Sequence, residues 1–219
     1  MNASNAALEP ILRACPIIPV ITLPSAECVM PLAETLITNG LTTLEITLRS
    51  PFALEAIGHL RRSFPKAVIG AGTLTQIDQI TALESVGAQF VVSPGATDAL
   101  IAAMNQSKMA FLPGAATPSE MMRLAQAGYT VQKFFPAAAM GGPAALKALS
   151  GPFSDLRFCA TGGIGFAQVA DYLRLQNVCA IGGSWMVDPA LIQEGAWSEI
   201  GQRAYAAGQL AITLSNGRK

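Results

Sequence analysis

Residues 17–40 read IIPVITLPSAECVMPLAETLITNG and join a short strand pattern to a helix pattern. The stretch opens with an apolar run of strand length, at residues 17–22. Further on, apolar residues recur at helical spacing, at Val29, Leu32, Ala33, Leu36 and Ile37, and Gly40 stands where the helix should stop. The stretch therefore predicts one strand followed by one helix.

The same unit recurs along the chain. Seven further strand patterns, each followed by a helix pattern, lie at residues 42–48, 67–71, 90–93, 110–113, 130–135, 157–161 and 178–182. Eight such units in 219 residues predict an α/β protein, a single-domain (β/α)8 TIM barrel over residues 1–219, with an extra N-terminal helix at about residues 4–14 across its bottom. The alternative is a doubly wound open sheet, which usually has a glycine-rich loop after its first strand. Residues 23–25 contain no glycine.

Two Ser/Thr-Pro pairs mark helix starts. Ser50-Pro51 and Thr117-Pro118 each predict a capping residue with proline at the first helical position. Glu120 adds a capping box to the second pair.

The composition excludes several classes of function. Hydrophobic residues make up 51% of the chain and charged residues 13%, with a net charge of zero. This balance argues against nucleic acid or an anionic membrane as a main partner. The single histidine, His59, falls in a helix pattern and is expected on the surface, so zinc clusters and Ser-His-Asp triads are excluded.

The cysteines and the N-terminus indicate the compartment. Cys15, Cys28, Cys159 and Cys179 form no C-x-x-C pair, which fits a reducing compartment better than a disulfide scaffold. The N-terminus lacks a signal-peptide pattern, and no apolar run reaches the roughly 18 residues that span a membrane. We expect a soluble cytoplasmic protein.

Lys133 is the most informative single residue. Of the five lysines, it alone lies within a strand pattern among apolar and aromatic neighbours. A buried ammonium tends to lose its proton, and a neutral amine attacks ketones and aldehydes to form a Schiff base. The alternative is a lysine at a strand end whose ammonium group reaches water.

The strand at residues 42–48 adds two charged residues. Its alternation places Glu45 and Arg49 on one face, which we expect to point into the barrel, and an apolar face against the helices. If the strand at 130–135 points Lys133 inward, an amine, a carboxylate that shuttles protons and a guanidinium that grips carboxylates share one cavity. The alternative is an internal Glu–Arg ion pair that serves structure alone.

Glycine pairs follow the last two strands, in Thr161-Gly162-Gly163-Ile164-Gly165 and in Gly182-Gly183-Ser184. Many barrels bind phosphate in these two loops through backbone N–H groups. The pairs predict a phosphate site, although either one alone could be ordinary turn chemistry. Thr73, at the end of the third strand, is a candidate hydrogen-bond donor to a substrate carboxylate.

Two motifs resemble the signatures of the KDPG/KHG aldolases, the 2-keto-3-deoxy-6-phosphogluconate and 4-hydroxy-2-oxoglutarate aldolases. They are GLTTLEITLR at residues 40–49 and GYTVQKFFP at residues 128–136. The resemblance covers nearly the whole chain. It implies a class I Schiff-base aldolase on a (β/α)8 barrel, without metal or other cofactor, usually a homotrimer.

The resemblance also implies the role of each site residue. Lys133 would form the Schiff base and Glu45 would be the acid/base, while Arg49 and Thr73 would hold the pyruvyl carboxylate. The distal phosphate would be held by Thr161, Gly162, Gly163, Gly183 and Ser184. Gln132 and Ala160 depart from the family pattern, and Gln132 needs a polar partner at the helix interface.

The implied reaction cleaves 2-dehydro-3-deoxy-6-phosphogluconate to pyruvate and glyceraldehyde 3-phosphate. The alternative main substrates are 4-hydroxy-2-oxoglutarate, which gives pyruvate and glyoxylate, and the 6-phosphogalactonate analogue, which matches the motif less well. Two other readings stay open. One is a phosphate-binding isomerase or epimerase in which Lys133 is only a cation, and the other is a non-catalytic sugar-phosphate sensor.

Overall fold

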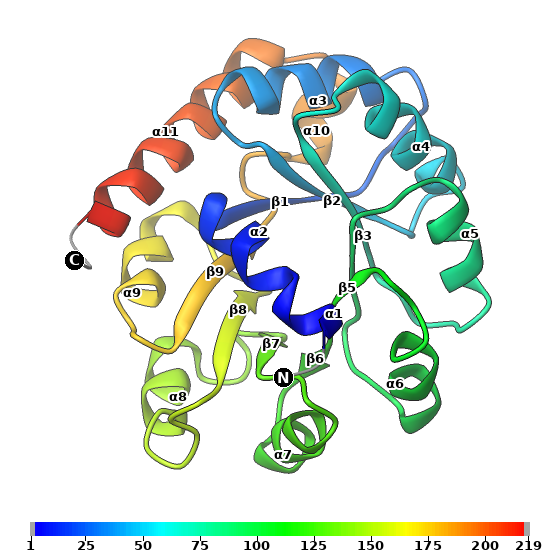
Figure 1. The fold of residues 1–219 in the computed structure, drawn as a ribbon. Coiled ribbons are helices and arrows are strands. Elements are labelled where there is room, and N and C mark those ends of the chain that lie inside the picture. The colour runs from blue at the N-terminus through cyan, green and yellow to red at the C-terminus, as the bar shows by residue number, and fades with distance from the viewer. Residues whose placement is uncertain (1–2, 217–219) are drawn as a thin grey trace.

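A computed structural model describes residues 3–216 of the protein. Its strands form one parallel sheet in the order β5-β4-β3-β2-β1-β9-β8-β7-β6. They are β1 (Ile17–Ile21), β2 (Thr43–Thr47), β3 (Val68–Gly72), β4 (Phe90–Val92), β5 (Ala110–Leu112), β6 (Gly114–Ala115), β7 (Val131–Phe134), β8 (Arg157–Thr161) and β9 (Val178–Gly183). Figure 1 shows the strands at the centre of a ring of helices.

The barrel closes through β5 and β6, which are two halves of one strand interrupted at Pro113. Phe111 of β5 is in register with Val91 of β4, whereas Gly114 of β6 is in register with Lys133 of β7. The Pro113 carbonyl accepts a hydrogen bond from the Lys133 N–H at 2.8 Å, so the ladder to β7 starts at the interruption. The eight-stranded barrel is therefore confirmed, with a fifth strand that runs past the predicted end.

Helices surround the strands on the outside. They are α3 (Val29–Thr38), α4 (Ala53–Ser63), α5 (Gln79–Ser85), α6 (Asp98–Met104), α7 (Pro118–Gln126), α8 (Gly142–Leu149), α9 (Val169–Leu173), α10 (Pro189–Gln193) and α11 (Trp197–Asn216), and the 3-10 turn η1 (Phe166–Gln168) precedes α9. The apolar outer face of the strands packs against these helices, as Leu44 and Ile46 of β2 do. No helix in residues 3–216 is both long enough and apolar enough to cross a membrane.

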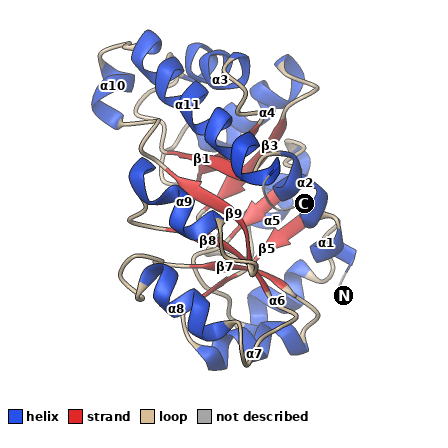
Figure 2. Ribbon diagram, turned by 90° about the vertical axis from the view of Figure 1, so that its left-hand side faces the viewer, coloured by secondary structure: helices blue, strands red, loops and turns tan. Residues whose placement is uncertain are grey.

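The predicted opening helix is two helices, α1 (Ala3–Ala6) and α2 (Leu8–Ala14). The physical reason is Pro10, which has no N–H to bond to the Ala6 carbonyl and so interrupts a continuous helix. Both helices cover one end of the barrel, seen from that end in Figure 1 and from the side in Figure 2. Leu8 and Leu12 plug the interior there, packed with the inward side chains of the strands.

One of the two predicted helix starts is correct. Thr117 and Glu120 form the capping box of α7. Ser50 caps no helix, since α4 begins only at Ala53. The reason is that Leu48 still bonds to the Gly72 carbonyl, at 2.8 Å, so the chain needs the next residues to turn back before the helix begins.

Candidate active site

The inward face of β2 carries the charged residue that the sequence predicts. Glu45 is 3% exposed and lies between Val20 of β1 and Gly70 of β3 in the sheet register. One pleat further, Gly72 leaves the space that the carboxylate fills, because a Cβ at that position would overlap Glu45. The sheet therefore encloses Glu45 inside the barrel.

Lys133 lies on β7 across the barrel from Glu45, and the two side chains meet. The Lys133 Nζ is 3.7 Å from the Glu45 Oε1, and Lys133 is 5% exposed. The same Nζ lies 5.1 Å from the centre of the Phe135 ring. The lysine is therefore buried, as expected, and its amine is enclosed between a carboxylate and an aromatic face.

A cavity of about 340 Å³ lies at the C-terminal ends of the strands. The predicted residues that line it are Arg49, Thr161, Gly162, Gly163, Gly183 and Ser184. Phe135 also lines it, so the ring that contacts Lys133 belongs to the cavity wall. Neither Lys133 nor Glu45 is among the residues that line the cavity; Lys133 is linked to it through the Phe135 ring, and Glu45 through Lys133.

Arg49 and Thr73 stand together at the mouth of the barrel. The Arg49 Nε donates a hydrogen bond to the Thr73 Oγ1 at 3.2 Å, and the arginine side chain is exposed. Thr73 has a φ of 66°, the left-handed region that a β-branched residue rarely adopts. A strained backbone of this kind is typical of functional sites.

The two glycine segments lie side by side because β8 pairs with β9, with Thr161 in register with Gly182. The second pair does not follow its strand as predicted, since Gly182 and Gly183 are the last two residues of β9, whose ladder runs one residue further. Gly162 and Gly163 have φ values of 103° and 72°, so both need glycine. A Cβ on Gly183 would strike the Trp185 ring. Position 183 therefore also needs glycine. All three glycines line the cavity, and backbone N–H groups in such loops suit an anion such as phosphate.

Five further residues line the cavity that were not predicted from the sequence. They are Val20, Thr22, Ile164, Val187 and Pro189. Ile18 and Val20 lie on the inward face of β1, and Thr22, directly after the strand, continues the same alternation, which was a usable signal. Ile164 and Val187 lie in loops, and Pro189 is the first residue of α10, so no periodic pattern shows which way these side chains point.

The departures at Gln132 and Ala160 lie away from the cavity lining. The Gln132 Nε2 donates to the carbonyls of Met121, at 3.0 Å, and Tyr129, at 2.9 Å, so the helix interface supplies partners for the amide. The Gln132 Oε1 has no protein partner. Ala160 is fully buried in the outer core.

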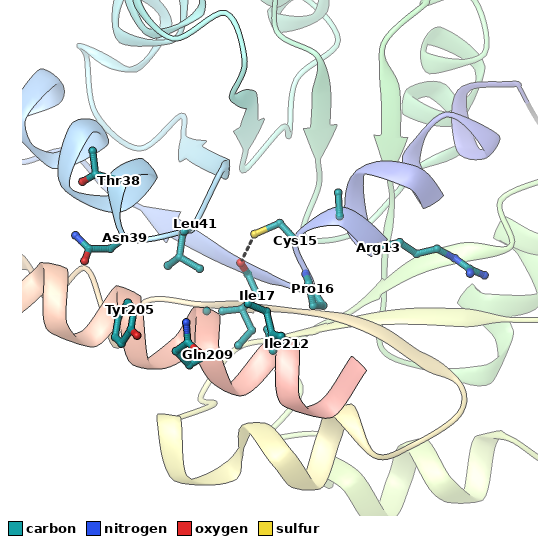
Figure 3. A pocket seen from close by; sticks show the side chains of 14 residues that line it. Arg13, Cys15, Pro16, Ile17, Thr38, Asn39, Leu41, Tyr205, Gln209 and Ile212 are labelled. Carbon is teal, nitrogen blue, oxygen red and sulfur yellow. Dashed lines mark hydrogen bonds between the residues drawn. The ribbon is translucent and has the colours of Figure 1, made fainter. Parts of the chain in front are cut away.

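A second hollow, of about 460 Å³, lies at the opposite end of β1, between α2, α3 and α11 (Figure 3). The thiol in this hollow belongs to Cys15, whose Sγ donates a hydrogen bond to the Ile17 carbonyl at 3.1 Å. Burial raises the pKa of the Cys15 thiol, so it stays protonated at neutral pH and is a poor nucleophile. None of the predicted site residues lies in this hollow.

The remaining sequence expectations concern other side chains. His59 is exposed on α4, as predicted. None of the four cysteines, all within residues 3–216, forms a disulfide. Within residues 3–216, no group of three or more His, Cys, Asp or Glu side chains is placed to hold a metal ion.

Together, the fold and the site define a (β/α)8-barrel protein with a buried amine–carboxylate pair beside a glycine-lined cavity at the C-terminal ends of the strands. Comparison with known proteins identifies the family. The KDPG and KHG aldolase family matches residues 8–203. The chain belongs to this family.

Curated relatives cover the same length. The 2-dehydro-3-deoxy-phosphogluconate aldolase of Pseudomonas aeruginosa is 44% identical over 200 residues, which are 91% of each chain. The KHG/KDPG aldolase of Escherichia coli K12 is 41% identical over 207 residues, or 94% of this chain and 97% of that one.

A solved structure agrees with the fold. The KDPG aldolase of Legionella pneumophila, with pyruvate captured at low pH as a covalent carbinolamine intermediate, superposes with a TM-score of 0.89 at 42% identity. The match covers 91% of this chain and 97% of that one.

Proposed function

We propose that the protein is a class I aldolase that cleaves 2-dehydro-3-deoxy-6-phosphogluconate to pyruvate and glyceraldehyde 3-phosphate. Membership of the family and the names of the relatives support the reaction. The observation that carries the mechanism is the enclosed pair of the Lys133 Nζ and the Glu45 Oε1, 3.7 Å apart, beside the cavity wall. It joins a nucleophile to an acid/base within reach of one substrate.

In the proposed mechanism, Lys133 supplies the nucleophile. Its neutral amine adds to the C2 ketone, and loss of water gives an iminium. The Glu45 carboxylate, directly or through a water, takes the proton of the C4 hydroxyl. The C3–C4 bond then breaks, its electrons pass to the iminium to form an enamine, and glyceraldehyde 3-phosphate leaves. Glu45 returns the proton to C3, and hydrolysis of the new iminium frees pyruvate.

The two ends of the substrate are anionic, and the cavity offers a group for each. Arg49, held by its bond to Thr73, suits the carboxylate beside the reacting ketone. Thr161, Gly162, Gly163, Gly183 and Ser184 suit the phosphate. In this orientation the ketone carbon faces Lys133 while the phosphate stays near the solvent.

Borohydride trapping tests the mechanism. The protein is incubated with pyruvate, reduced and analysed by peptide mass spectrometry, and we expect one reduced pyruvate adduct on Lys133. Lys133→Ala should form no adduct and release no pyruvate. Lys147→Ala, at an exposed lysine of α8, is the matched control and should keep both properties.

The alternatives give different results in the same assay. If no adduct of pyruvate mass forms on Lys133, the aldolase mechanism is wrong, and an isomerase or epimerase with a cationic lysine becomes the better reading. A wild-type protein that binds the sugar acid but never releases pyruvate would be a sensor.

A second substrate is supported by a specific observation. The Escherichia coli relative carries both activities in its name, KHG/KDPG aldolase. We therefore propose that 4-hydroxy-2-oxoglutarate is also cleaved, to pyruvate and glyoxylate, by the same lysine. Rates of pyruvate release from the two substrates measure the preference.

We also propose a cytoplasmic homotrimer. The family resemblance supports the trimer, and four cysteines without a disulfide support a reducing compartment. Light scattering in solution should give three times the subunit mass, and a monomeric mass would contradict the assembly.

A further inference from the structure

Two threonines face each other on the inward side of the barrel mouth. The register of β1 and β2 pairs Val20 with Glu45 and Ile21 with Ile46, so the next step brings Thr22 beside Thr47. Their Oγ1 atoms are 2.9 Å apart. Thr47 is 0% exposed, whereas Thr22 is half-buried and lines the cavity.

This hydrogen bond fixes Thr22 and leaves part of its hydroxyl free. A threonine hydroxyl offers one donor and two acceptor positions, and the bond to Thr47 uses one of them. Because Thr47 is enclosed, its own hydroxyl depends on this bond. Whichever oxygen donates, Thr22 presents an oriented polar group to the cavity, and Thr47 holds it there.

The position of Thr22 in the barrel determines which part of the substrate it contacts. β1 lies between β2 and β9 in the sheet, so Thr22 stands between Arg49 on one side and the Gly183–Ser184 backbone on the other. These are the groups proposed above for the carboxylate and the phosphate. The side chains of Val20 and Phe135, which also line the cavity, are apolar. A hydroxyl group in the middle of the substrate therefore finds a hydrogen-bonding partner in Thr22.

We infer that Thr22 is a specificity-determining residue that binds the hydroxyl group next to the aldehyde carbon of the phosphorylated aldehyde. The inference rests on the proposed function and deepens it. In the sugar acid, C3 carries no hydroxyl and the C4 hydroxyl gives its proton to Glu45, so the C5 hydroxyl is the one left for Thr22. After cleavage, this group is the α-hydroxyl of glyceraldehyde 3-phosphate.

The test uses the reverse reaction, the addition of pyruvate to an aldehyde. D-glyceraldehyde 3-phosphate is compared with 3-oxopropyl phosphate, which lacks only the α-hydroxyl. For Thr22→Val we expect kcat/KM to fall about tenfold with glyceraldehyde 3-phosphate and to stay unchanged with 3-oxopropyl phosphate, because the hydroxyl loses its partner. Thr22→Ser should restore the preference. Thr47→Val should reduce it less, because it removes only the group that orients Thr22.

The outcomes separate this inference from the proposed function. Equal losses with both aldehydes, or no change with either, would overturn the role of Thr22. Borohydride trapping of pyruvate on Lys133 should remain complete in Thr22→Val, and an unchanged unfolding temperature shows that the variant is folded. If the wild-type protein forms no pyruvate adduct, the proposed function fails first, and this inference fails with it.

Discussion

Gly72 lies directly against the Glu45 carboxylate, on the neighbouring strand, and a methyl group at Gly72 would overlap the Glu45 Oε1. The carboxylate therefore keeps its place beside Lys133 only while position 72 has no side chain. Because the contact is internal to the sheet, backbone movement cannot easily relieve it. The relationship ties a backbone position on β3 to the acid/base proposed on β2.

Gly72→Ala should therefore displace Glu45 and slow the reaction. Misplacing a catalytic group by about 1 Å costs on the order of 100-fold in rate, and we expect a loss of about that size in kcat for pyruvate release. Gly95→Ala is the matched control, since a Cβ there meets nothing within 4 Å, and it should keep normal activity. A Gly72→Ala enzyme with wild-type kcat would show that Glu45 needs no fixed position.

Replacing Thr73 with glycine should make the fold more stable and substrate binding weaker. Its φ of 66° is unfavourable for threonine and favourable for glycine. Thr73→Gly should therefore raise the free energy of unfolding by up to about 1 kcal/mol. The same change removes the Oγ1 that accepts from Arg49, so KM for the sugar acid should rise about tenfold.

Denaturant unfolding and steady-state kinetics of the same Thr73 variants check both halves of that prediction. Thr73→Ser, which keeps the hydroxyl and the positive φ, should change neither property strongly. A Thr73→Gly variant with a lower free energy of unfolding and a normal KM would contradict the view that the strained backbone at Thr73 is kept for substrate binding.

Strand alternation is the sequence pattern that carries the most information about the site. Period-two patterning places Glu45 and Lys133 on inward faces, and the structure shows both enclosed. The glycine pairs after β8 and at the end of β9 could be located because barrel topology brings these two segments together. Each of these inferences needs only one strand or one connection at a time.

The features that were missed depend on how separate segments fit together. The meeting of Thr22 with Thr47 follows from the register between β1 and β2, which neither strand encodes alone. The need for glycine at position 72 arises from a side chain on the next strand. The late start of α4 after Ser50 comes from a ladder bond to β3. Local patterns do not carry such information.

Asn5 should be important for stability although it lies far from the site. Its fully buried amide bonds to both backbone groups of Val131, accepting from the N–H and donating to the carbonyl at 2.9 Å each, and accepts from Thr130 N–H at 3.0 Å. Asn5→Ala leaves these backbone groups unpaired, so the free energy of unfolding should fall by about 2–3 kcal/mol.

Chemical denaturation of Asn5→Ala measures this loss, with Gln106→Ala, at an exposed position, as the control. Because Asn5 is at the opposite end of the barrel, the folded variant should keep its kcat. A stability equal to that of the wild type would mean that α1 contributes nothing to holding β7.

The carboxyl of Glu120, in the first turn of α7, should make the stability of the protein depend on pH. Hydrogen bonds from the Ala116 and then the Thr117 backbone N–H, both at 2.8 Å, lower the pKa of its carboxyl. The folded-state pKa is thus below the unfolded value, so the stabilisation is complete above about pH 4.5 and disappears as pH falls through the folded-state pKa.

Glu120→Gln should cost about 0.5–1 kcal/mol at pH 7, and this difference from the wild type should shrink steadily toward pH 3. Urea unfolding of both proteins at several pH values measures it. A Glu120→Gln difference that grows on acidification would reverse the sign and rule out the charged cap.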